Sequence, residues 1–214
     1  MNKHSAFLKA IIANRFRAYD RAFLESESHF RLQAEEAFPF TNAELAEMDD
    51  EERASNVDWY VDDYVEYSKT FPEVLRTGYL IGYYSLYEYF LRYICARAKQ
   101  HKNIDIDLAI ITGRGIFQAK IYLEKICGIK DLGNHQWQAI VCINKIRNSL
   151  VHNLGVLEVS ENNDKIGLLQ YFEKNSVTIE RDSLNRIIIK DGYIETVSKL
   201  FKDNLEGTIS KAFS

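Results

Sequence analysis

Proline and glycine are scarce in this chain, which holds only two prolines and ten glycines in 214 residues. This scarcity argues against a turn-rich β-sandwich and against long flexible linkers. Most segments instead carry apolar residues at helical spacing. Because 46% of the residues are hydrophobic, the chain can bury one sizeable core without metals or disulfides. We therefore predict a mainly α protein.

Cysteine is also scarce. Cys95, Cys127 and Cys142 form an odd set without a C-x-x-C pair, which argues against a disulfide framework and against a zinc site. We predict that all three are buried apolar side chains in a reducing cytoplasm. The sequence implies no metal and no other cofactor, because the histidines outside the motif described below show no ligand spacing. These are His4, His29, His101 and His135.

Uninterrupted apolar runs are missing as well. Lys9, Arg15 and Arg17 interrupt the N-terminal segment, which therefore does not resemble a signal peptide. The segment from Gly78 to Ala96 is long enough to span a membrane, but it contains Glu88, Arg92 and six tyrosines. We therefore expect a cytoplasmic protein that does not cross a membrane.

The chain has a net charge of −4. Its acidic residues cluster in "ELAEMDDEER" at 44–53 and "DWYVDDYVE" at 58–66. A molecule with this charge repels polyanions, so any nucleic-acid site must be local.

Helical patterns dominate up to residue 153, and turn signals mark their ends. Thr41 with Glu44 forms a capping box, Pro72 is a favoured first-turn residue, and Gly128 and Gly155 are C-terminal stops. These signals predict helices over 6–38, 41–70, 72–100, 114–127 and 134–153.

The last 60 residues change in character. A short helix over 166–174 is followed by two short strands around an Asp-Ser-Leu-Asn turn, which predicts a β-hairpin at about 176–190. A closing helix is expected over 193–205. We predict an N-terminal helical extension over 1–70, packed on a helical bundle over 71–214 that contains the hairpin.

The segment 143–153, "INKIRNSLVHN", places strong hydrogen-bonding groups in a helix that its aliphatic residues predict to be buried. On a helical wheel, one side is a normal core stripe, whereas the other mixes apolar with polar residues, which suggests a packed interface around a polar site. The alternative is a surface or capping arrangement in which Asn148 and His152, four residues apart, hydrogen-bond to each other. The core stripe contains Ala139, Cys142, Ile143, Ile146 and Leu150, and the mixed face contains Trp137, Ile140, Val141, Asn144, Arg147, Asn148, Val151 and His152.

Arg147-Asn148-x-x-x-His152 resembles the R-N-x-x-x-H signature of the HEPN ribonuclease superfamily, at the C-terminal end of a bundle helix as in that family. Residues 71–98 resemble the superfamily's earlier helix, with Glu88 in the position of its recurrent acidic residue. Residues 113–129 resemble the segment that links the two helices. The resemblance covers about 71–210, is concentrated in the motif, and does not extend to the first 70 residues.

The resemblance implies a HEPN-like helical bundle that forms a homodimer through the helices carrying Arg147 and His152. It also implies a metal-independent endoribonuclease with RNA as its substrate. His152 would act as general base, general acid, or one of each across the dimer, while Arg147 would bind the non-bridging phosphate oxygens. Asn148 would orient His152 or hold substrate, or would only satisfy a helix-end carbonyl.

Glu88 and Asn144 are supporting candidates. Glu88 could pair with Arg147 or His152, or form an ordinary surface ion pair with Arg92, four residues away. The chain departs from one branch of the family, in which a tyrosine two residues after the motif histidine is modified by an antitoxin. Leu154 stands at that position, so this form of control is not expected.

Two functions from different classes follow. The first is a toxin or defence effector that cleaves RNA and is inhibited or activated by a partner protein. The second is a non-catalytic bundle of the same type that binds a nucleotide, RNA or a protein partner. An enzyme of another kind using Glu88 and His152 has no supporting motif. Nine of the thirteen tyrosines lie between Tyr60 and Tyr93, and such a stripe is more often core or interface than a base-stacking surface.

Overall fold

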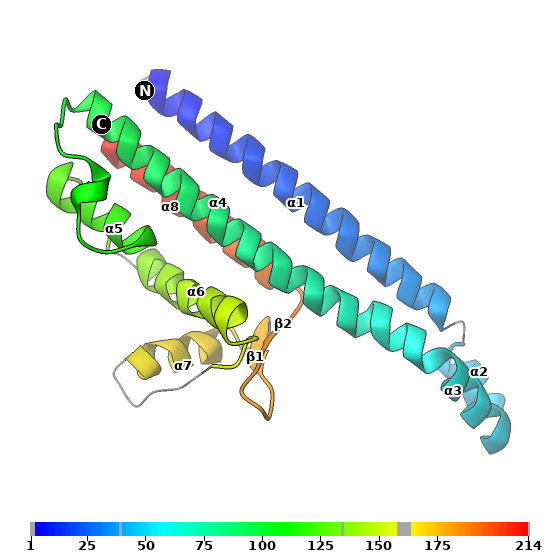
Figure 1. Cartoon of the computed structure of the whole chain (residues 1–214). Coiled ribbons are helices and arrows are strands. Elements are labelled where there is room, and N and C mark those ends of the chain that lie inside the picture. The colour runs from blue at the N-terminus through cyan, green and yellow to red at the C-terminus, as the bar shows by residue number, and fades with distance from the viewer. Residues whose placement is uncertain (1–2, 39, 134, 158–163, 214) are drawn as a thin grey trace. The chain divides into compact units, whose positions relative to one another are not determined.

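The computed structural model describes residues 3–38, 40–133, 135–157 and 164–213 (Figure 1). The protein is mainly α, with a two-stranded antiparallel hairpin near the C-terminus followed by a closing helix, as the sequence predicted. The chain divides into two compact units. Unit 1 contains residues 1–20 and 80–214, and unit 2 contains residues 21–79.

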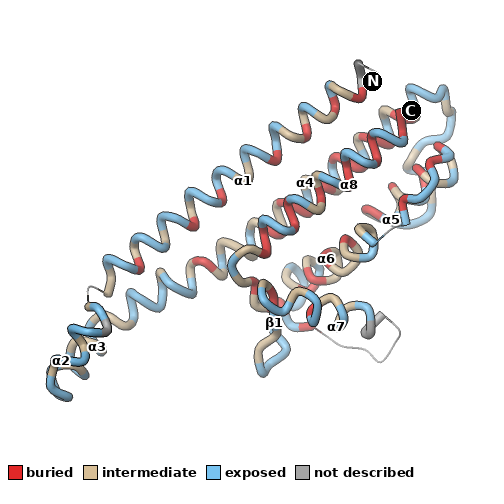
Figure 2. The backbone as a smooth tube through the Cα atoms, turned by 180° about the vertical axis from the view of Figure 1, so that it is seen from behind, coloured by how far each residue is buried: buried red, intermediate tan, exposed pale blue. Residues whose placement is uncertain are grey.

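Helices α1 (Lys3–Ala37) and α4 (Phe71–His101) each contribute to both units. In unit 1, α4 lies beside α8 (Tyr193–Ala212), and the buried residues are concentrated along these two helices (Figure 2). Tyr87 of α4 stacks on Phe201 of α8, with ring centroids 4.5 Å apart, and its hydroxyl donates a hydrogen bond to Asn204 Oδ1. The start of α1 completes this core with Leu8, Ile12 and Phe16.

The remaining elements of unit 1 lie between α4 and α8 along the chain. They are a 3-10 turn (Leu108–Ile110), α5 (Gly115–Ile121) with a π turn (Tyr122–Ile126), α6 (His135–His152), α7 (Asp164–Lys174), β1 (Ile179–Arg181) and β2 (Ile187–Ile189). β1 and β2 pair with Ile179 opposite Ile189. Asp182 forms the predicted turn, because its side chain accepts hydrogen bonds from the backbone N–H groups of Leu184 and Arg186.

Three of the predicted boundaries are wrong. α8 continues seven residues beyond the predicted end, because Thr208, Ile209 and Ala212 are still buried. The helix predicted over 41–70 is interrupted at Met48 and Asp49, giving α2 (Asn42–Glu47) and α3 (Asp50–Val65). The Thr41–Glu44 capping box is confirmed, but Asp49 forms a second cap by accepting a hydrogen bond from the Glu52 N–H.

Pro72 does not begin a helix, which is the third difference. α3 continues through a π turn (Glu66–Thr70) directly into α4, where the Phe71 N–H donates to the Glu66 carbonyl. A proline inside a helix lacks the N–H that would bond one turn back, and the widened π turn just before Pro72 accommodates that loss. Pro72 therefore lies within a continuous helix. Its side chain is buried.

In unit 2, aromatic pairs and the ion pair between Glu27 and Arg76 hold the helices together. Arg76 donates to both carboxylate oxygens of Glu27 at 2.7 and 2.8 Å, and Phe23 packs edge-on against Tyr79. α3 has no buried residue.

The predicted burial is confirmed for Cys95 and Cys127, whereas Cys142 is only half-buried. Burial raises the pKa of the Cys95 thiol to about 12, so this thiol stays protonated. Among the described helices, none is both long and apolar enough to cross a membrane.

Candidate functional site

The motif residues lie on the C-terminal half of α6, in unit 1. Asn148 and His152 are exposed, while Asn144 and Arg147 are half-buried. Arg147 Nη1 donates a hydrogen bond to Asn148 Oδ1 at 3.0 Å, and Asn148 Nδ2 donates to Asn144 Oδ1 at 3.3 Å. The three side chains therefore form one polar ladder in which Asn148 holds Arg147.

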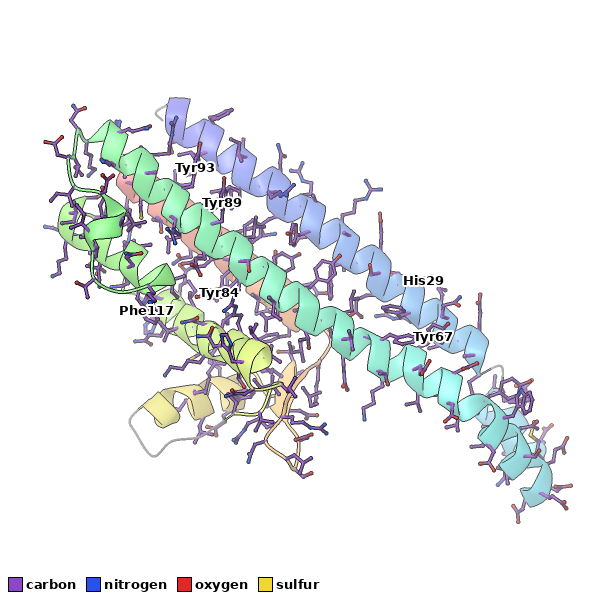
Figure 3. All side chains as sticks on the ribbon, viewed as in Figure 1. His29, Tyr67, Tyr84, Tyr89, Tyr93 and Phe117 are labelled. Carbon is purple, nitrogen blue, oxygen red and sulfur yellow. The ribbon has the colours of Figure 1, made fainter. Side chains whose placement is uncertain are left out.

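The guanidinium of Arg147 packs against a tyrosine of the neighbouring helix. Its Cζ lies 5.4 Å from the ring centroid of Tyr84, a buried residue of α4 on the side that faces α6 (Figure 3). Tyr84 in turn contacts Phe201 edge-on, with centroids 6.3 Å apart, so the core of unit 1 fixes its ring. This stacking holds Arg147 in place without using its N–H donors.

Arg147 keeps unused hydrogen-bonding capacity. Its Nε is buried and has no hydrogen-bond partner, and Asn148 is the only acceptor that the described part of the chain offers to the guanidinium. A buried N–H without an acceptor is unfavourable by about 1–3 kcal/mol and is uncommon in folded proteins. An anionic group bound at Arg147 would find donors still available.

Tyr84 lies within the electrostatic influence of two opposite charges. Burial raises its pKa, the carboxylate of Glu88 raises it further, and the positive charge of Arg147 opposes the rise. The phenol is therefore neutral at physiological pH. Tyr84 serves as a supporting ring and not as a base.

Glu88 is half-buried on α4, one turn after Tyr84. Within the described residues it forms no ion pair with Arg147, His152 or Arg92, so neither pairing expected for it occurs. Its carboxylate instead lies against the start of α5, where a Cβ on Gly115 would be 3.4 Å from both carboxylate oxygens. The positive φ of Gly115, +58°, is a conformation that favours glycine at this contact.

His152 is the last residue of α6 and is exposed. The helix ends there because the backbone N–H groups of Asn153 and Gly155 both donate to the Ser149 carbonyl, while Gly155 adopts a φ of +82°. Ser149 Oγ donates to the Val156 carbonyl and ties down the following turn. The alternative hydrogen bond between Asn148 and His152 does not form among these described side chains.

Arg147 and His152 do not contact each other in the described part of a single chain. Five residues on a helix rotate the side-chain direction by about 140° and advance it by about 7.5 Å. Arg147 accordingly turns toward α4, whereas His152 is exposed at the helix end. One chain therefore presents the two groups without joining them.

The division of α6 into two faces needs one correction. Ile140, predicted on the mixed face, is fully buried with Ile143 and Ile146 in the core of unit 1, whereas Cys142 of the predicted core stripe is only half-buried. The core stripe therefore extends to Ile140. The other residues of the mixed face are half-buried or exposed, namely Trp137, Val141, Asn144, Arg147, Asn148, Val151 and His152.

Exposed apolar side chains lie near both ends of the mixed face of α6. Val151 is 42% exposed and Leu154 is 91% exposed. Leu154 also has a φ of +52°, which costs a non-glycine residue about 1–2 kcal/mol. On α5, Phe117 and Ile121 are also exposed, and Phe117 packs edge-on against Trp137 of α6. An apolar rim around a polar centre is typical of a surface that another molecule covers.

The two units differ sharply in charge. Unit 2 contains five basic and fifteen acidic residues, a net charge of −10, so the remaining 22 basic and 16 acidic residues give unit 1 a net charge of +6. The sequence predicted general repulsion of polyanions from the net charge of −4. That value does not describe unit 1, which carries the motif and is positive. Long-range attraction of an anionic ligand to unit 1 is favourable.

Tyr84 and Gly115 were not among the predicted site residues. Tyr84 precedes Glu88 by one helical turn, so the wheel of α4 could have placed both on the same side. No group of three histidine, cysteine, aspartate or glutamate side chains that could hold a metal ion occurs among the described residues. No protein-family model matches the chain, and no curated protein or solved structure matches it significantly.

Proposed function

We propose that this protein is a metal-independent endoribonuclease of the HEPN type, in which the α6 helices of two copies form one cleavage site. The observation that carries the proposal is Arg147, which is fixed by Tyr84 and Asn148 while its Nε lacks a partner. A guanidinium held in this way is suited to a phosphate, whose non-bridging oxygens accept its planar donors. The net charge of +6 on unit 1 supports a polyanionic substrate.

The homodimer follows from the separation of Arg147 and His152. Because the two side chains diverge around α6 by about 140°, one copy cannot easily direct both at the same phosphate. A second α6 facing the first would bring the histidine of one copy toward the arginine of the other. The exposed Leu154 and Val151 supply apolar area for that contact.

The chemistry needs only these side chains and the RNA. A neutral His152 removes the proton from the 2′-hydroxyl, and that oxygen attacks the adjacent phosphorus. Arg147 stabilises the extra negative charge on the non-bridging oxygens. A protonated histidine gives its proton to the departing 5′-oxygen, so the products are a 2′,3′-cyclic phosphate and a free 5′-hydroxyl. Histidine suits both roles because its charge changes near neutral pH.

Asn148 and Glu88 have supporting roles in this proposal. Asn148 positions Arg147 through the bond to Nη1, and Asn144 in turn holds Asn148. Glu88 adds negative charge near Tyr84 without neutralising Arg147 in an ion pair. Uncontrolled RNA cleavage harms the cell that makes the enzyme, so we place the protein among toxins or defence effectors that a partner protein restrains or activates.

Cleavage of total RNA and transfer RNA in excess EDTA tests the proposal, with wild type compared with Arg147→Ala and His152→Ala. We expect losses of about 10²- to 10³-fold for Arg147→Ala and about 10²- to 10⁴-fold for His152→Ala. The matched control is His135→Ala, an exposed histidine at the other end of the same helix, which should cleave like wild type. The ends of the products should be cyclic phosphates.

Two results would contradict the nuclease. Equal cleavage by all four proteins would indicate a contaminating enzyme. RNA binding without cleavage by wild type, even with an extract that contains its natural partners, would favour the non-catalytic binding module instead.

A further inference from the structure

A second group of aromatic and basic side chains lies on α4, outside the site described above. Tyr89 is 61% exposed, although it belongs to a helix whose other side forms the core of unit 1. Its ring stacks on Tyr93 with centroids 6.3 Å apart and planes only 8° from parallel. Arg97 continues the row, with its Cζ 6.0 Å from the centroid of the Tyr93 ring. We call Tyr89, Tyr93 and Arg97 the α4 row; Figure 3 labels its two tyrosines.

The α4 row runs along the length of the helix. Its members follow each other by four residues and therefore lie on one side of the helix. Buried core residues, including Phe90 and Ile94, lie next to the row on the helix, and the Tyr89 ring packs edge-on against the Phe90 ring with centroids 5.3 Å apart. Tyr89 stays 61% exposed beside these two rings, so part of its surface is accessible to a ligand. A flat aromatic ring with an open face is a platform on which a nucleobase can stack.

Positive charge accompanies the α4 row. Arg97 Nη1 donates to Gln100 Oε1, which leaves its other donors available, and the exposed Arg92 forms no ion pair with the described residues. On the helix, Arg92 falls about 40° from Glu88 and about 60° from Tyr89. Arg92 therefore lies between the α6 site, which rests on Tyr84 and Glu88, and the α4 row.

The row ends at a hollow. Arg97 lines a pocket of about 170 Å³ together with Leu8, Gln100, His101 and Phe213. The rings of His101 and Phe213 lie 5.4 Å apart. Aromatic rings next to arginine and histidine suit both parts of a nucleotide, the flat base and the phosphate.

We propose that the α4 row, which begins about 140° around α4 from Tyr84, binds single-stranded RNA where the strand continues away from the cleaved phosphate, with one base stacked on Tyr89 and the sugar-phosphate backbone held by Arg92 and Arg97. This inference rests on the proposed nuclease function and names its substrate class. Bases inside a duplex have no free face, so the row selects unpaired RNA. Stacking is tolerant of sequence, because every base has a π-face, and selection by base identity is not expected from this surface.

The test uses full-length protein with His152→Ala as the common background, so that the RNA stays intact. The probe is a fluorescein-labelled single-stranded RNA of about 12 nucleotides, within the range of common single-strand sites. Fluorescence anisotropy gives the dissociation constant, and we expect Tyr89→Ala to weaken binding roughly 5- to 150-fold. Tyr89→Phe keeps the ring and should bind within about twofold of the parent.

Two further variants separate stacking from charge. Arg97→Gln should reduce the dependence of log affinity on log salt by about 0.7, the value for one phosphate contact on a single strand. Trp59→Ala removes an aromatic residue that is 80% exposed in the acidic unit 2, and it should leave binding unchanged. Because Tyr89 and Trp59 are both exposed, neither variant should alter the thermal midpoint, which is measured in parallel.

Three results would overturn the proposal for the α4 row. If the parent binds single-stranded RNA and both Tyr89→Ala and Arg97→Gln bind equally well, the RNA lies elsewhere and the nuclease proposal is unaffected. If Tyr89→Ala changes the oligomeric mass and not the RNA affinity, the row is a protein interface. If no variant binds RNA, the row has no such role, and the wild-type cleavage assay then decides separately whether the nuclease proposal also fails.

Discussion

Units 1 and 2 differ in both burial and charge. Unit 2 has only four buried residues among those that the structure describes, Phe23, Glu27, Ala34 and Pro72, whereas unit 1 contains the other buried residues of the described chain. Unit 2 has a net charge of −10 and unit 1 of +6. The comparison indicates that stability and the candidate site both reside in unit 1, and that composition averaged over the whole chain hides this.

The largest effect on stability should come from removing a core ring of unit 1. Phe201 is fully buried and contacts both Tyr84 and Tyr87, so Phe201→Ala should lower the free energy of unfolding by about 3–5 kcal/mol. The counterpart in unit 2, Trp59→Ala, should change it by no more than about 0.5 kcal/mol. Denaturant unfolding measures both, and equal losses would contradict the difference between the units.

A smaller loss is expected at Asp20, which joins three helices of unit 1. Its carboxylate accepts hydrogen bonds from Tyr83, Ser198 and Lys202 at 2.6, 2.6 and 2.9 Å. Asp20→Asn should lower the free energy of unfolding by about 1–3 kcal/mol at neutral pH. Unfolding curves for wild type and the variant provide the measurement.

The effect of Asp20 should also depend on pH. Burial alone would raise the pKa of Asp20, but the three hydrogen bonds and the charge of Lys202 together lower it below its usual value. A carboxyl whose pKa is lower in the folded state stabilises the protein above its unfolded pKa and loses that contribution as the pH falls through its folded pKa. The difference between wild type and Asp20→Asn should therefore shrink in acid, and a constant difference would contradict this assignment.

In unit 2, the bidentate ion pair between Glu27 and Arg76 joins α1 to α4, as Asp20 joins helices in unit 1. The side chains of Arg76 and Glu27 are only 15% and 9% exposed, so Glu27→Gln should weaken local stability by about 1–3 kcal/mol. Hydrogen exchange should show faster amide exchange in residues 21–37 and 71–79, and little change in α8. Faster exchange in α8 to the same extent would show that the two units open together.

The smallest of these effects concerns Tyr84, which links the core of unit 1 to the site. Tyr84→Leu removes the ring under Arg147 and should slow RNA cleavage roughly tenfold, about 1.4 kcal/mol. Tyr84→Phe keeps the ring and should cleave like wild type, because the phenol is not used as a base. Equal loss in both variants would instead assign the hydroxyl a role.

Local signals in the sequence predicted much of the fold. The hairpin follows from the turn that Asp182 caps, and the beginning of α2 from the Thr41–Glu44 box, because both depend on hydrogen bonds between close neighbours in the chain. The helix through Pro72 was not predictable from such signals, since the preceding π turn decides whether a proline interrupts or continues the helix. The break at Met48 was missed because Asp49, an ordinary acidic residue in an acidic cluster, serves as a cap.

The sequence names the polar residues of the candidate site but not the residues that surround them. The motif spacing identified Arg147, Asn148 and His152, and a wheel of α6 alone separated the two faces. The wheel placed the edge of the core incorrectly at Ile140, because packing against other helices decides how far a core stripe extends. Tyr84 belongs to a different helix, and only the tertiary structure brings its ring under Arg147.

RNA cleavage by a site made of two α6 helices is tested most directly by measuring the cleavage rate and the molecular mass on the same samples across a dilution series. Wild type is compared with Leu154→Glu, which places a charge on the 91% exposed rim residue. We predict that activity per chain falls in step with the dimer fraction, and that Leu154→Glu is monomeric and inactive while still folded. A monomer that cleaves RNA at the full rate would contradict the composite site.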